Sequence, residues 1–372
     1  MGIWDASKLH VIESVEGLTA LQLVWMLPPY SKNNHLEMPE VYLNELLSNK
    51  SKESLYGFFK EKDWPADIDV SLEGHLGDYR SGGRLFSFSL YLTNSGLKKK
   101  YEMINYVYQY IKLLRDMIPQ EWVWNQYWKM KEIEFDCLDV SGMAANSPSD
   151  FARYLSGNML KYPITHVVSA DYVRKSWNPK AIVNLMEEFT PKNMRMDLLV
   201  NSLDATDPRT EPWFGTHFIE EQIPLEMIKK WSNISEVDSS LRFPKENLFV
   251  PTAVNLRRVI RVTTAVPICI VDKPGIKMWH QSLEDGPAYA YFCISLTDGE
   301  YSIKKQLIYH IFTELVKDEL SYIIFEGKQA SISNSFSVSE DKLVLKFRCC
   351  REKFTLFISK FWQNFQVFLS KT

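Results

Sequence analysis

The stretch Arg84–Leu92, RLFSFSLYL, alternates large apolar side chains with smaller or more polar ones. Its strongly apolar positions are Phe86, Phe88, Leu90 and Leu92. Because successive side chains of a strand point to opposite faces, the pattern predicts a strand with one apolar face. From 97 to 114, apolar residues then recur at steps of three and four, which predicts a helix. A one-sided strand followed by an amphipathic helix indicates a layer of sheet covered by helices.

The pattern extends in both directions from this stretch. Upstream, strands are predicted at 8–13, 18–27 and 67–75, with helical sequence between the second and third. Downstream, Pro119 opens another helical segment, and Ser-Pro and Asn-Pro pairs predict the starts of helices at 148 and 179. Alternating apolar residues from 194 to 200 predict one more strand.

After residue 250 the opening order returns. Strands are predicted at 276–282, 288–297, 331–338 and 342–349, and helices at 301–326 and in the last twenty residues. The order strand–strand–helix–strand–strand–helix therefore occurs twice, which we interpret as an internal structural repeat. The expected core face of the helix at 301–326 consists of Leu307, Ile311, Leu315 and Leu320. The last helix ends in Phe365, Val367, Phe368 and Leu369. We expect this apolar helix to be exposed and one sheet face to lack a cover.

Residues 204–250 differ in composition from both copies of the repeat. They are rich in Pro, Trp, Asn and Ser and show little periodicity. We interpret them as an ordered connection, because the segment is too aromatic for a flexible linker. The predicted organisation is a first unit at 1–203, a connection at 204–250 and a second unit at 251–372.

Composition excludes several classes of protein. The 372 residues have a net charge of −3 with both signs interspersed, which argues against an electrostatic nucleic-acid binder. No apolar run approaches the roughly 18 residues of a membrane span. The five cysteines are odd in number and lack CxxC spacing, which disfavours a disulfide framework or a structural zinc site. We therefore expect a cytoplasmic protein without nucleic-acid or membrane partners.

Catalytic motifs are missing from the sequence. Seven histidines are present, and the closest two are 25 residues apart, so neither HExxH nor HxxEH occurs. Those motifs need two imidazoles on one helical face beside an activating Glu. The nearest match, at 217–221, reads HFIEE and is expected to be a surface loop. The sequence therefore predicts no catalytic residue and no metal ligand.

Two smaller features allow alternative readings. Trp124 and Trp128 share one helical face, so they either pack against a neighbouring element or form an aromatic wall for peptides. Cys349 and Cys350 lie in a predicted strand with no sign of a nearby base, so we expect buried structural thiols.

Eight stretches carry a more specific signal. They are LTNSGL (92–97), YQYIKLLR (108–115), PQEW (119–122), NMLKYP (158–163), TPKNMR (190–195), EPWFGT (211–216), KWSN (230–233) and FVPT (249–252). With them the chain resembles the insulysin/nardilysin family of pitrilysin-type, inverzincin metallopeptidases, in particular its plant nardilysin-like members. The resemblance implies an α+β fold of tandem homologous units, each a mainly antiparallel sheet packed with helices, with the second unit truncated.

The resemblance also implies a position within the family's architecture. Members contain four homologous units in two bowl-shaped halves, which enclose a chamber for peptides. By this resemblance, residues 1–203 correspond to the family's second unit, residues 204–250 to the connection, and residues 251–372 to the first half of the family's third unit. The zinc site, HxxEH plus a downstream Glu, belongs to the first unit of intact members. No cofactor is therefore expected in this chain.

The family's exosite would map to Ile68, Asp69, Val70 and Ser71. In relatives this edge strand captures the N-terminus of a substrate by strand addition. The chain departs from the family in two places: Val70 and Ser71 replace a Gly-Gly pair, and NKSKE (49–53) replaces a glycine-rich GHEGxGS segment before Ser54.

Together these features predict a noncatalytic middle portion of a nardilysin/insulysin-like zinc metalloendopeptidase, which contributes chamber wall or peptide-contact surface and is inactive by itself. The expected partners are peptides, an intact family member or the missing catalytic unit. Two alternatives remain open from the sequence: a standalone pseudo-protease with a regulatory role, and a truncated gene product without independent function.

Overall fold

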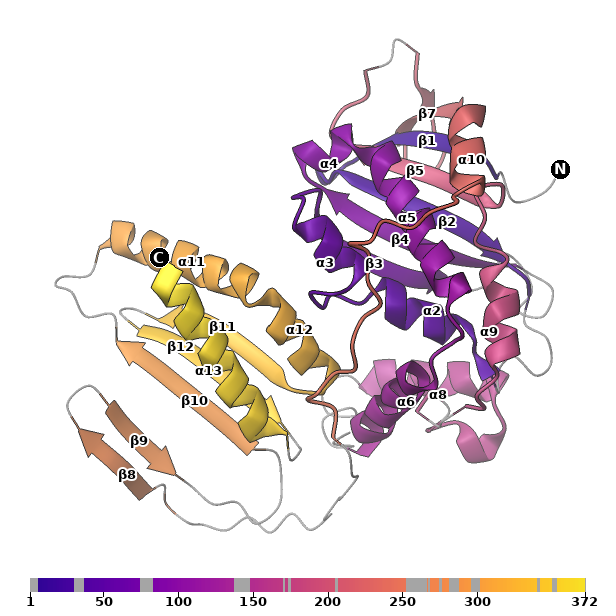
Figure 1. The fold of residues 1–372 in the computed structure, drawn as a ribbon. Coiled ribbons are helices and arrows are strands. Elements are labelled where there is room, and N and C mark those ends of the chain that lie inside the picture. Colours follow the sequence, from indigo (N-terminus) through magenta and orange to yellow (C-terminus); the bar gives the residue numbers. More distant parts are fainter. Residues whose placement is uncertain are drawn as a thin grey trace. The chain divides into compact units, whose positions relative to one another are not determined.

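The computed structural model describes residues 6–29, 37–73, 83–136, 148–169, 171–172, 175–204, 207–251, 266, 268–273, 276–280, 288–295, 302–339, 342–349 and 353–371. The chain divides into two compact units (Figure 1). One comprises residues 1–128 and 174–246, and the other comprises 129–173 and 247–372. The division that we expected at 203 and 250 concerns family units and stays a prediction.

The first unit is built on a seven-stranded sheet of order β3-β4-β2-β5-β1-β7-β6. Its strands are β1 (Lys8–Glu13), β2 (Ala20–Leu27), β3 (Pro65–Glu73), β4 (Arg84–Leu92), β5 (Met194–Val200), β6 (Arg209–Thr210) and β7 (His217–Gln222). Only β1 and β5 pair in parallel, and every other pair in this sheet is antiparallel. The five strands predicted in this part of the chain are confirmed within a few residues of their ends.

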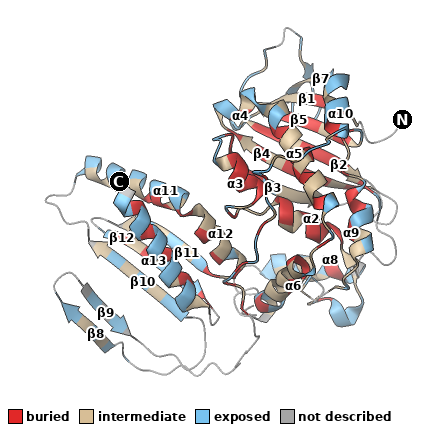
Figure 2. Ribbon diagram, in the orientation of Figure 1, coloured by how far each residue is buried: buried red, intermediate tan, exposed pale blue. Residues whose placement is uncertain are grey.

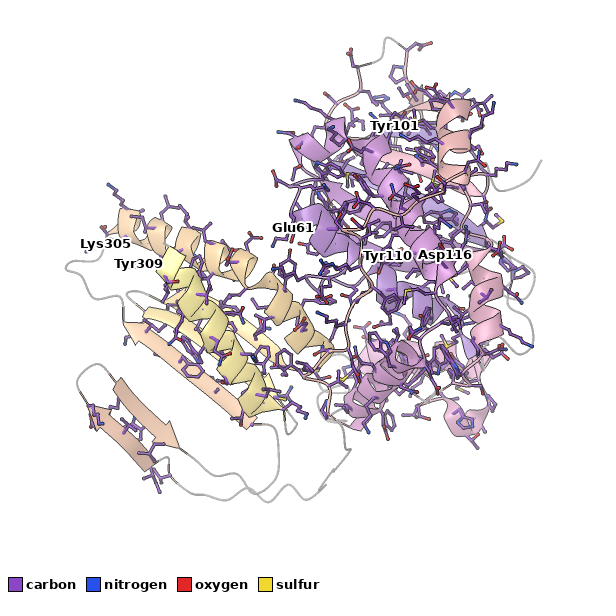
Figure 3. All side chains as sticks on the ribbon, in the orientation of Figure 1. Glu61, Tyr101, Tyr110, Asp116, Lys305 and Tyr309 are labelled. Atoms are coloured by element: carbon purple, nitrogen blue, oxygen red, sulfur yellow. The ribbon has the colours of Figure 1, made fainter. Side chains whose placement is uncertain are left out.

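Helices cover one face of this sheet. They are α2 (Glu40–Leu47), α3 (Leu55–Lys60), α4 (Asn94–Lys98), α5 (Lys100–Asp116), α9 (Pro179–Met186) and α10 (Leu225–Ser232). Tyr101 lies near the start of α5 and Asp116 ends it (Figure 3). In the core, Trp25 of β2 donates to the hydroxyl of Tyr108 at 3.3 Å and packs 5.2 Å from the ring of Phe189. The apolar face predicted for β4 lies in the same core, with Phe86, Phe88 and Leu90 fully buried.

The second unit contains a three-stranded antiparallel sheet of order β10-β12-β11. Its elements are the hairpin β8 (Ile268–Lys273) and β9 (Ile276–His280), β10 (Ala288–Ser295), α11 (Ile303–Glu319), α12 (Ser321–Gln329), β11 (Ser333–Ser339), β12 (Lys342–Cys349), α13 (Phe354–Lys371) and, earlier in the chain, α8 (Pro148–Lys161) and a 3-10 turn at Ile164–His166. The order β10-β12-β11 matches β2-β4-β3 of the first unit, with two helices at the same place in the connection. The α+β fold and its internal repeat are thereby confirmed.

The repeat is shorter than the sequence suggested. The first strand of the second copy, β9, pairs with β8 in a separate hairpin instead of joining the sheet. β8 itself was missed, although exposed Ile268 and Ile270 alternate with the half-buried Cys269 and Val271 in a pattern that is typical of a strand.

The last helix is better covered than we expected. Phe357, Phe361, Phe365 and Phe368 of α13 are buried in the core of the second unit, so the prediction of an exposed apolar helix was wrong for its aromatic face. The missing cover for one sheet face stays a prediction. Of the residues predicted for the core face of α11, Leu320 is buried as expected, and the prediction was wrong for the other three. Leu307, Ile311 and Leu315 are more than half exposed, whereas Val316 and Leu320 are buried. The helix has two apolar arcs, and periodicity alone cannot tell which of them faces the sheet.

Two further expectations concern the first unit. The HFIEE segment is strand β7 of the sheet, paired with β1, so the surface loop was a wrong prediction. Trp124 and Trp128, on α6 (Glu121–Asp136), are buried together with Val41, and their ring centroids lie 5.7 Å apart. This burial confirms the packing interpretation over the peptide-binding wall.

Cys349 is buried as expected, and Cys350 lies outside the described residues. No helix in the described ranges is long and apolar enough to cross a membrane.

Candidate functional site

The predicted exosite residues lie on an edge strand. Ile68, Asp69, Val70 and Ser71 are central in β3, which pairs with β4 on one side and with no other described strand. In this register Val70 faces Phe88 and Ser71 faces Ser87. An edge strand presents a row of N–H and C=O groups away from its partner, which another extended chain can pair with. The geometry of β3 therefore permits strand addition.

The side chains of β3 differ between its two faces. Ile68 is buried beside helices α2 and α3, whereas Asp69, its neighbour, is exposed on the opposite face. At the start of the strand a bulge separates Pro65 from Asp67. The buried isoleucine fixes the register of β3, because a slip of one residue would move it to the solvent face.

The turn before α3 is built without the glycine run of relatives. Residues 49–55, all of them described, contain no positive φ angle. Instead, the side chain of Asn49 accepts from the amide of Ser51 at 2.9 Å, and the hydroxyl of Ser54 accepts from the amide of Gly57 at 3.1 Å. The side chain of Ser54 thus caps α3 and satisfies a backbone amide of its first turn.

The sheet face opposite the helices carries a row of charged groups. His10 of β1 stands between Asp197 of β5 and Glu220 of β7 in the strand register. Its Nδ1 lies 3.0 Å from Asp197 Oδ1, and its Nε2 lies 3.9 Å from Glu220 Oε2. Sequence reasoning missed this row, because it became visible only once β7 was recognised as a strand.

Both carboxylates in the row are paired with cations. Arg195 donates to Asp197 Oδ2 from Nε and Nη2, at 3.1 and 2.7 Å. Glu220 receives Lys8 at 2.5 Å and Arg209 at 3.1 Å. The hydrogen bond from Lys8, with the charges of Lys8, Arg209 and His10, holds the pKa of Glu220 below its ordinary value. The row reads as a cross-strand network that fixes β5, β1 and β7.

These residues do not fit the zinc of the family. Within the described part of the chain, no group of three or more His, Cys, Asp or Glu side chains is arranged to hold a metal ion. The nearest candidate is the row around His10, and there guanidinium and ammonium groups already occupy the carboxylate oxygens. A zinc ion would have to displace those cations to gain a third ligand.

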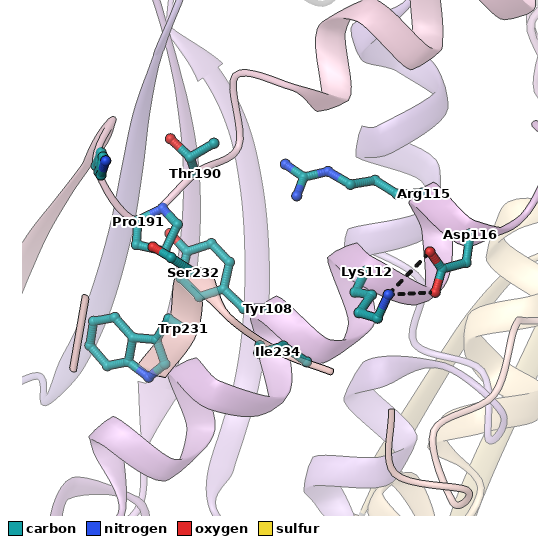
Figure 4. A pocket seen from close by; sticks show the side chains of 10 residues that line it. Tyr108, Lys112, Arg115, Asp116, Thr190, Pro191, Trp231, Ser232 and Ile234 are labelled. Carbon is teal, nitrogen blue, oxygen red and sulfur yellow. Dashed lines mark hydrogen bonds and ion pairs between the residues drawn. The ribbon is translucent and has the colours of Figure 1, made fainter. Parts of the chain in front are cut away.

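A cavity of about 420 Å³ opens between α5, the segment 190–192 that precedes β5, and the end of α10 (Figure 4). Its charged residues serve the fold: Arg115 Nη2 donates to the carbonyls of Met186 and Phe189, and Lys112 lies 2.9 Å from Asp116. Burial raises the pKa of the Tyr108 hydroxyl, so this phenol stays protonated. The cavity offers no nucleophile with an adjacent base, and β3 remains the candidate site.

Comparison with known proteins places this geometry in a family. A profile described as the middle or third domain of peptidase M16 matches residues 143–372. A nardilysin-like protein of Arabidopsis thaliana is 38% identical over 367 residues, which cover 96% of this chain and 35% of that protein. The human insulin-degrading enzyme is 24% identical, over 97% of this chain and 34% of its own length. The chain thus spans about a third of the curated relatives it matches.

A solved structure supports the fold. The crystal structure of pitrilysin superimposes with a TM-score of 0.70 at 14% identity, over 96% of this chain and 37% of pitrilysin. The match extends across both compact units, and the family profile covers more than half of the chain. The chain therefore belongs to the peptidase M16 family, within which it is similar to nardilysin, the insulin-degrading enzyme and pitrilysin.

Proposed function

We propose that this chain is a noncatalytic, peptide-binding part of an M16 peptidase and that it captures extended peptides along β3. The observation that carries the proposal is the position of Ile68–Ser71 on the edge of a seven-stranded sheet. Strand addition takes its affinity from main-chain hydrogen bonds and therefore tolerates many sequences. A member of a peptidase family needs that tolerance when it handles different peptides.

The replacement of the relatives' glycine pair by Val70 and Ser71 is compatible with this role. A β-branched residue favours the extended backbone that an edge strand must keep, and neither position requires a positive φ angle. The side chain of Val70 is only partly buried, so it offers apolar surface to a neighbouring strand. We infer a binding edge that is stiffer than one made of two glycines.

The chemical step belongs, in this proposal, to other parts of a longer M16 protein. No described histidine lies beside a second histidine and an acid in a zinc-binding arrangement. The chain alone would therefore bind peptides without cleaving them.

The test is peptide binding by proline variants of β3. Neighbouring residues of an antiparallel strand direct their amides alternately toward the partner strand and away from it. Of Val70→Pro and Ser71→Pro, one therefore removes an outward N–H and the other removes a bond to β4. Binding of fluorescein-labelled insulin B chain would be followed by anisotropy, with the Tm of each variant measured in parallel.

We expect the outward variant to bind at least about tenfold more weakly while its Tm changes by less than about 2 °C. The inward variant should lose thermal stability, since it breaks the pairing with β4. Unchanged affinity in both variants, or no binding by the unsubstituted chain, would refute strand addition at β3.

A further inference from the structure

One face of the β10-β12-β11 sheet is exposed in the described part of the second unit. The helices pack on the other face, where the rings of Phe361 and Phe347 lie 4.9 Å apart. Along β10 the residues of that covered face, Ala290, Phe292 and Ile294, alternate with exposed ones (Figure 2). Because the side chains of a strand alternate between its two sides, the exposed residues share the opposite face.

Strand pairing arranges six exposed residues of this face in two rows, which we call the basic face. Tyr289, Arg348 and Ser333 form one row across β10, β12 and β11, and Tyr291, Lys346 and Ser335 form the next. Side chains directly opposite each other on neighbouring strands have Cβ atoms about 4.5–5.5 Å apart. Each row therefore places an aromatic ring, a cation and a hydroxyl side by side.

The two tyrosines of the basic face form an open aromatic surface. Their rings are stacked, with centroids 6.1 Å apart and planes 13° from parallel. Tyr289 is 48% exposed and Tyr291 is 62% exposed. Large amphipathic rings that remain exposed beside cations are typical of binding surfaces.

The charge of the basic face has one sign. Lys346 and Arg348 are exposed on its central strand, and none of the three strands contains Asp or Glu. A cationic surface without acidic residues of its own is complementary to a ligand with negative charges. The nature of the ligand therefore depends on the spacing of the two cations.

That spacing matches an extended peptide. Lys346 and Arg348 are two residues apart on β12, so their Cα atoms are separated by about 6.8 Å. Acidic residues at alternate positions of an extended chain have the same separation. The serine hydroxyls of β11 can donate to the same carboxylates, and the tyrosine rings can contact the side chains between them.

We propose that the basic face binds an extended acidic peptide segment with Asp or Glu at alternate positions. The proposal concerns the second unit and does not depend on the capture of peptides at β3. Single-stranded nucleic acid is a poorer match, because the whole chain has a net charge of −3 and would repel a polyanion at long range. The basic face also offers only two cations, whereas nucleic-acid sites neutralise several phosphates.

The first test compares ligands by fluorescence anisotropy with the whole chain. A fluorescein-labelled peptide of alternating Glu and Thr is the probe, and a peptide of alternating Gln and Thr is its neutral control. The acidic peptide should bind at least about tenfold more tightly, and added salt should weaken it. Equal affinities for the two peptides, or tighter binding of oligouridine of the same length, would overturn the proposal.

The second test locates the site by substitution. Lys346→Glu should weaken binding of the acidic peptide at least about tenfold, because it sets like charges opposite each other. The matched control is Lys360→Glu, which makes the same change at an exposed position of α13, the helix on the covered face. The control should bind as the unsubstituted chain does, and equal effects of the two substitutions would refute a site on the basic face.

The third test separates loss of contact from loss of fold. The double variant Lys346→Glu/Arg348→Glu should prefer a peptide of alternating Lys and Thr, a gain that an unfolded chain would not show. Tyr291→Ala should weaken binding, whereas Tyr291→Phe should retain it, since the ring makes the contact. A double variant that shows no preference for the basic peptide would contradict the proposal.

Discussion

Arg84 and Glu40 form a buried ion pair in the first unit: Arg84 Nη1 lies 2.8 Å from Glu40 Oε1, with the two side chains only 1 and 3% exposed. Arg84 belongs to β4 and Glu40 to the first turn of α2, and the Nε of Arg84 also donates to the carbonyl of Pro28. The pair therefore joins α2 to β4, which lies two strands from the central strand of the sheet. Both charged groups are buried there and have almost no contact with water.

Removal of one partner should expose the cost of the buried charge. Glu40→Ala leaves the guanidinium of Arg84 buried without its carboxylate and should lower the free energy of unfolding by about 3–5 kcal/mol. Urea-induced unfolding followed by circular dichroism measures the change. The control is Asp116→Ala, which breaks the exposed pair with Lys112 and should cost less than about 1 kcal/mol. Equal effects of the two substitutions would contradict the role given to burial.

Substitution of two helical glycines by alanine should change the stability of the chain in opposite directions. A methyl group on Gly327 of α12 would lie 2.9 Å from Cζ of the buried Phe357 and still closer to Cε2, whereas one on Gly157 of α8 would meet no atom within 4 Å. Gly327→Ala should therefore destabilise by about 1–3 kcal/mol through overpacking. Gly157→Ala should stabilise by up to about 1 kcal/mol, because alanine favours the helix. The same unfolding curves distinguish the two signs.

The pairing of β1 with β7 should weaken in acid. The pKa of Glu220 is lowered in the folded chain by Lys8 and its neighbours, so the folded state binds this proton less readily than the unfolded state. The stabilisation is present above the ordinary value of 4.5 and is lost as the pH falls through the lower folded value. Glu220→Gln removes the titrating carboxyl group, so the Tm of the variant should depend less on pH below 4.5 than the Tm of the unsubstituted chain does. An identical pH profile in the variant would contradict this assignment.

Catalysis is predicted to be absent from the isolated chain. Quenched fluorogenic peptides incubated with the purified chain and added zinc should show no turnover, because no described group of side chains can hold the ion. The Arabidopsis nardilysin-like protein serves as a reference in the same assay. Turnover by this chain that a chelator abolishes would show that it contains a metal site of its own.

The sequence predicted those parts of the fold where the pattern of apolar residues is compatible with only one type of secondary structure and one buried face. The alternation at Phe86, Phe88 and Leu90 requires a strand, and the helix after it must cover that face. Trp124 and Trp128 are buried because two indoles on one helical face have more to gain from the core than from water.

The failures have physical causes as well. On β7 the charged Glu220 is paired with Lys8 and Arg209, which lie on the neighbouring strands β1 and β6. Long-range pairing of that kind leaves no local signal. On α11 the exposed arc of Leu307 and Ile311 is as periodic as the buried arc, so sequence alone gave the wrong face. The edge position of β3 likewise depends on strand order, which only the structure supplies.

Hydrogen–deuterium exchange of the chain, with and without saturating insulin B chain, tests peptide capture most directly. Strand addition protects the outward amides of an edge strand and leaves the interior strands unaffected. We predict that bound peptide slows exchange within Pro65–Glu73 and not within β2 or β5. Protection that appears elsewhere while the exchange of β3 stays unchanged would contradict the account.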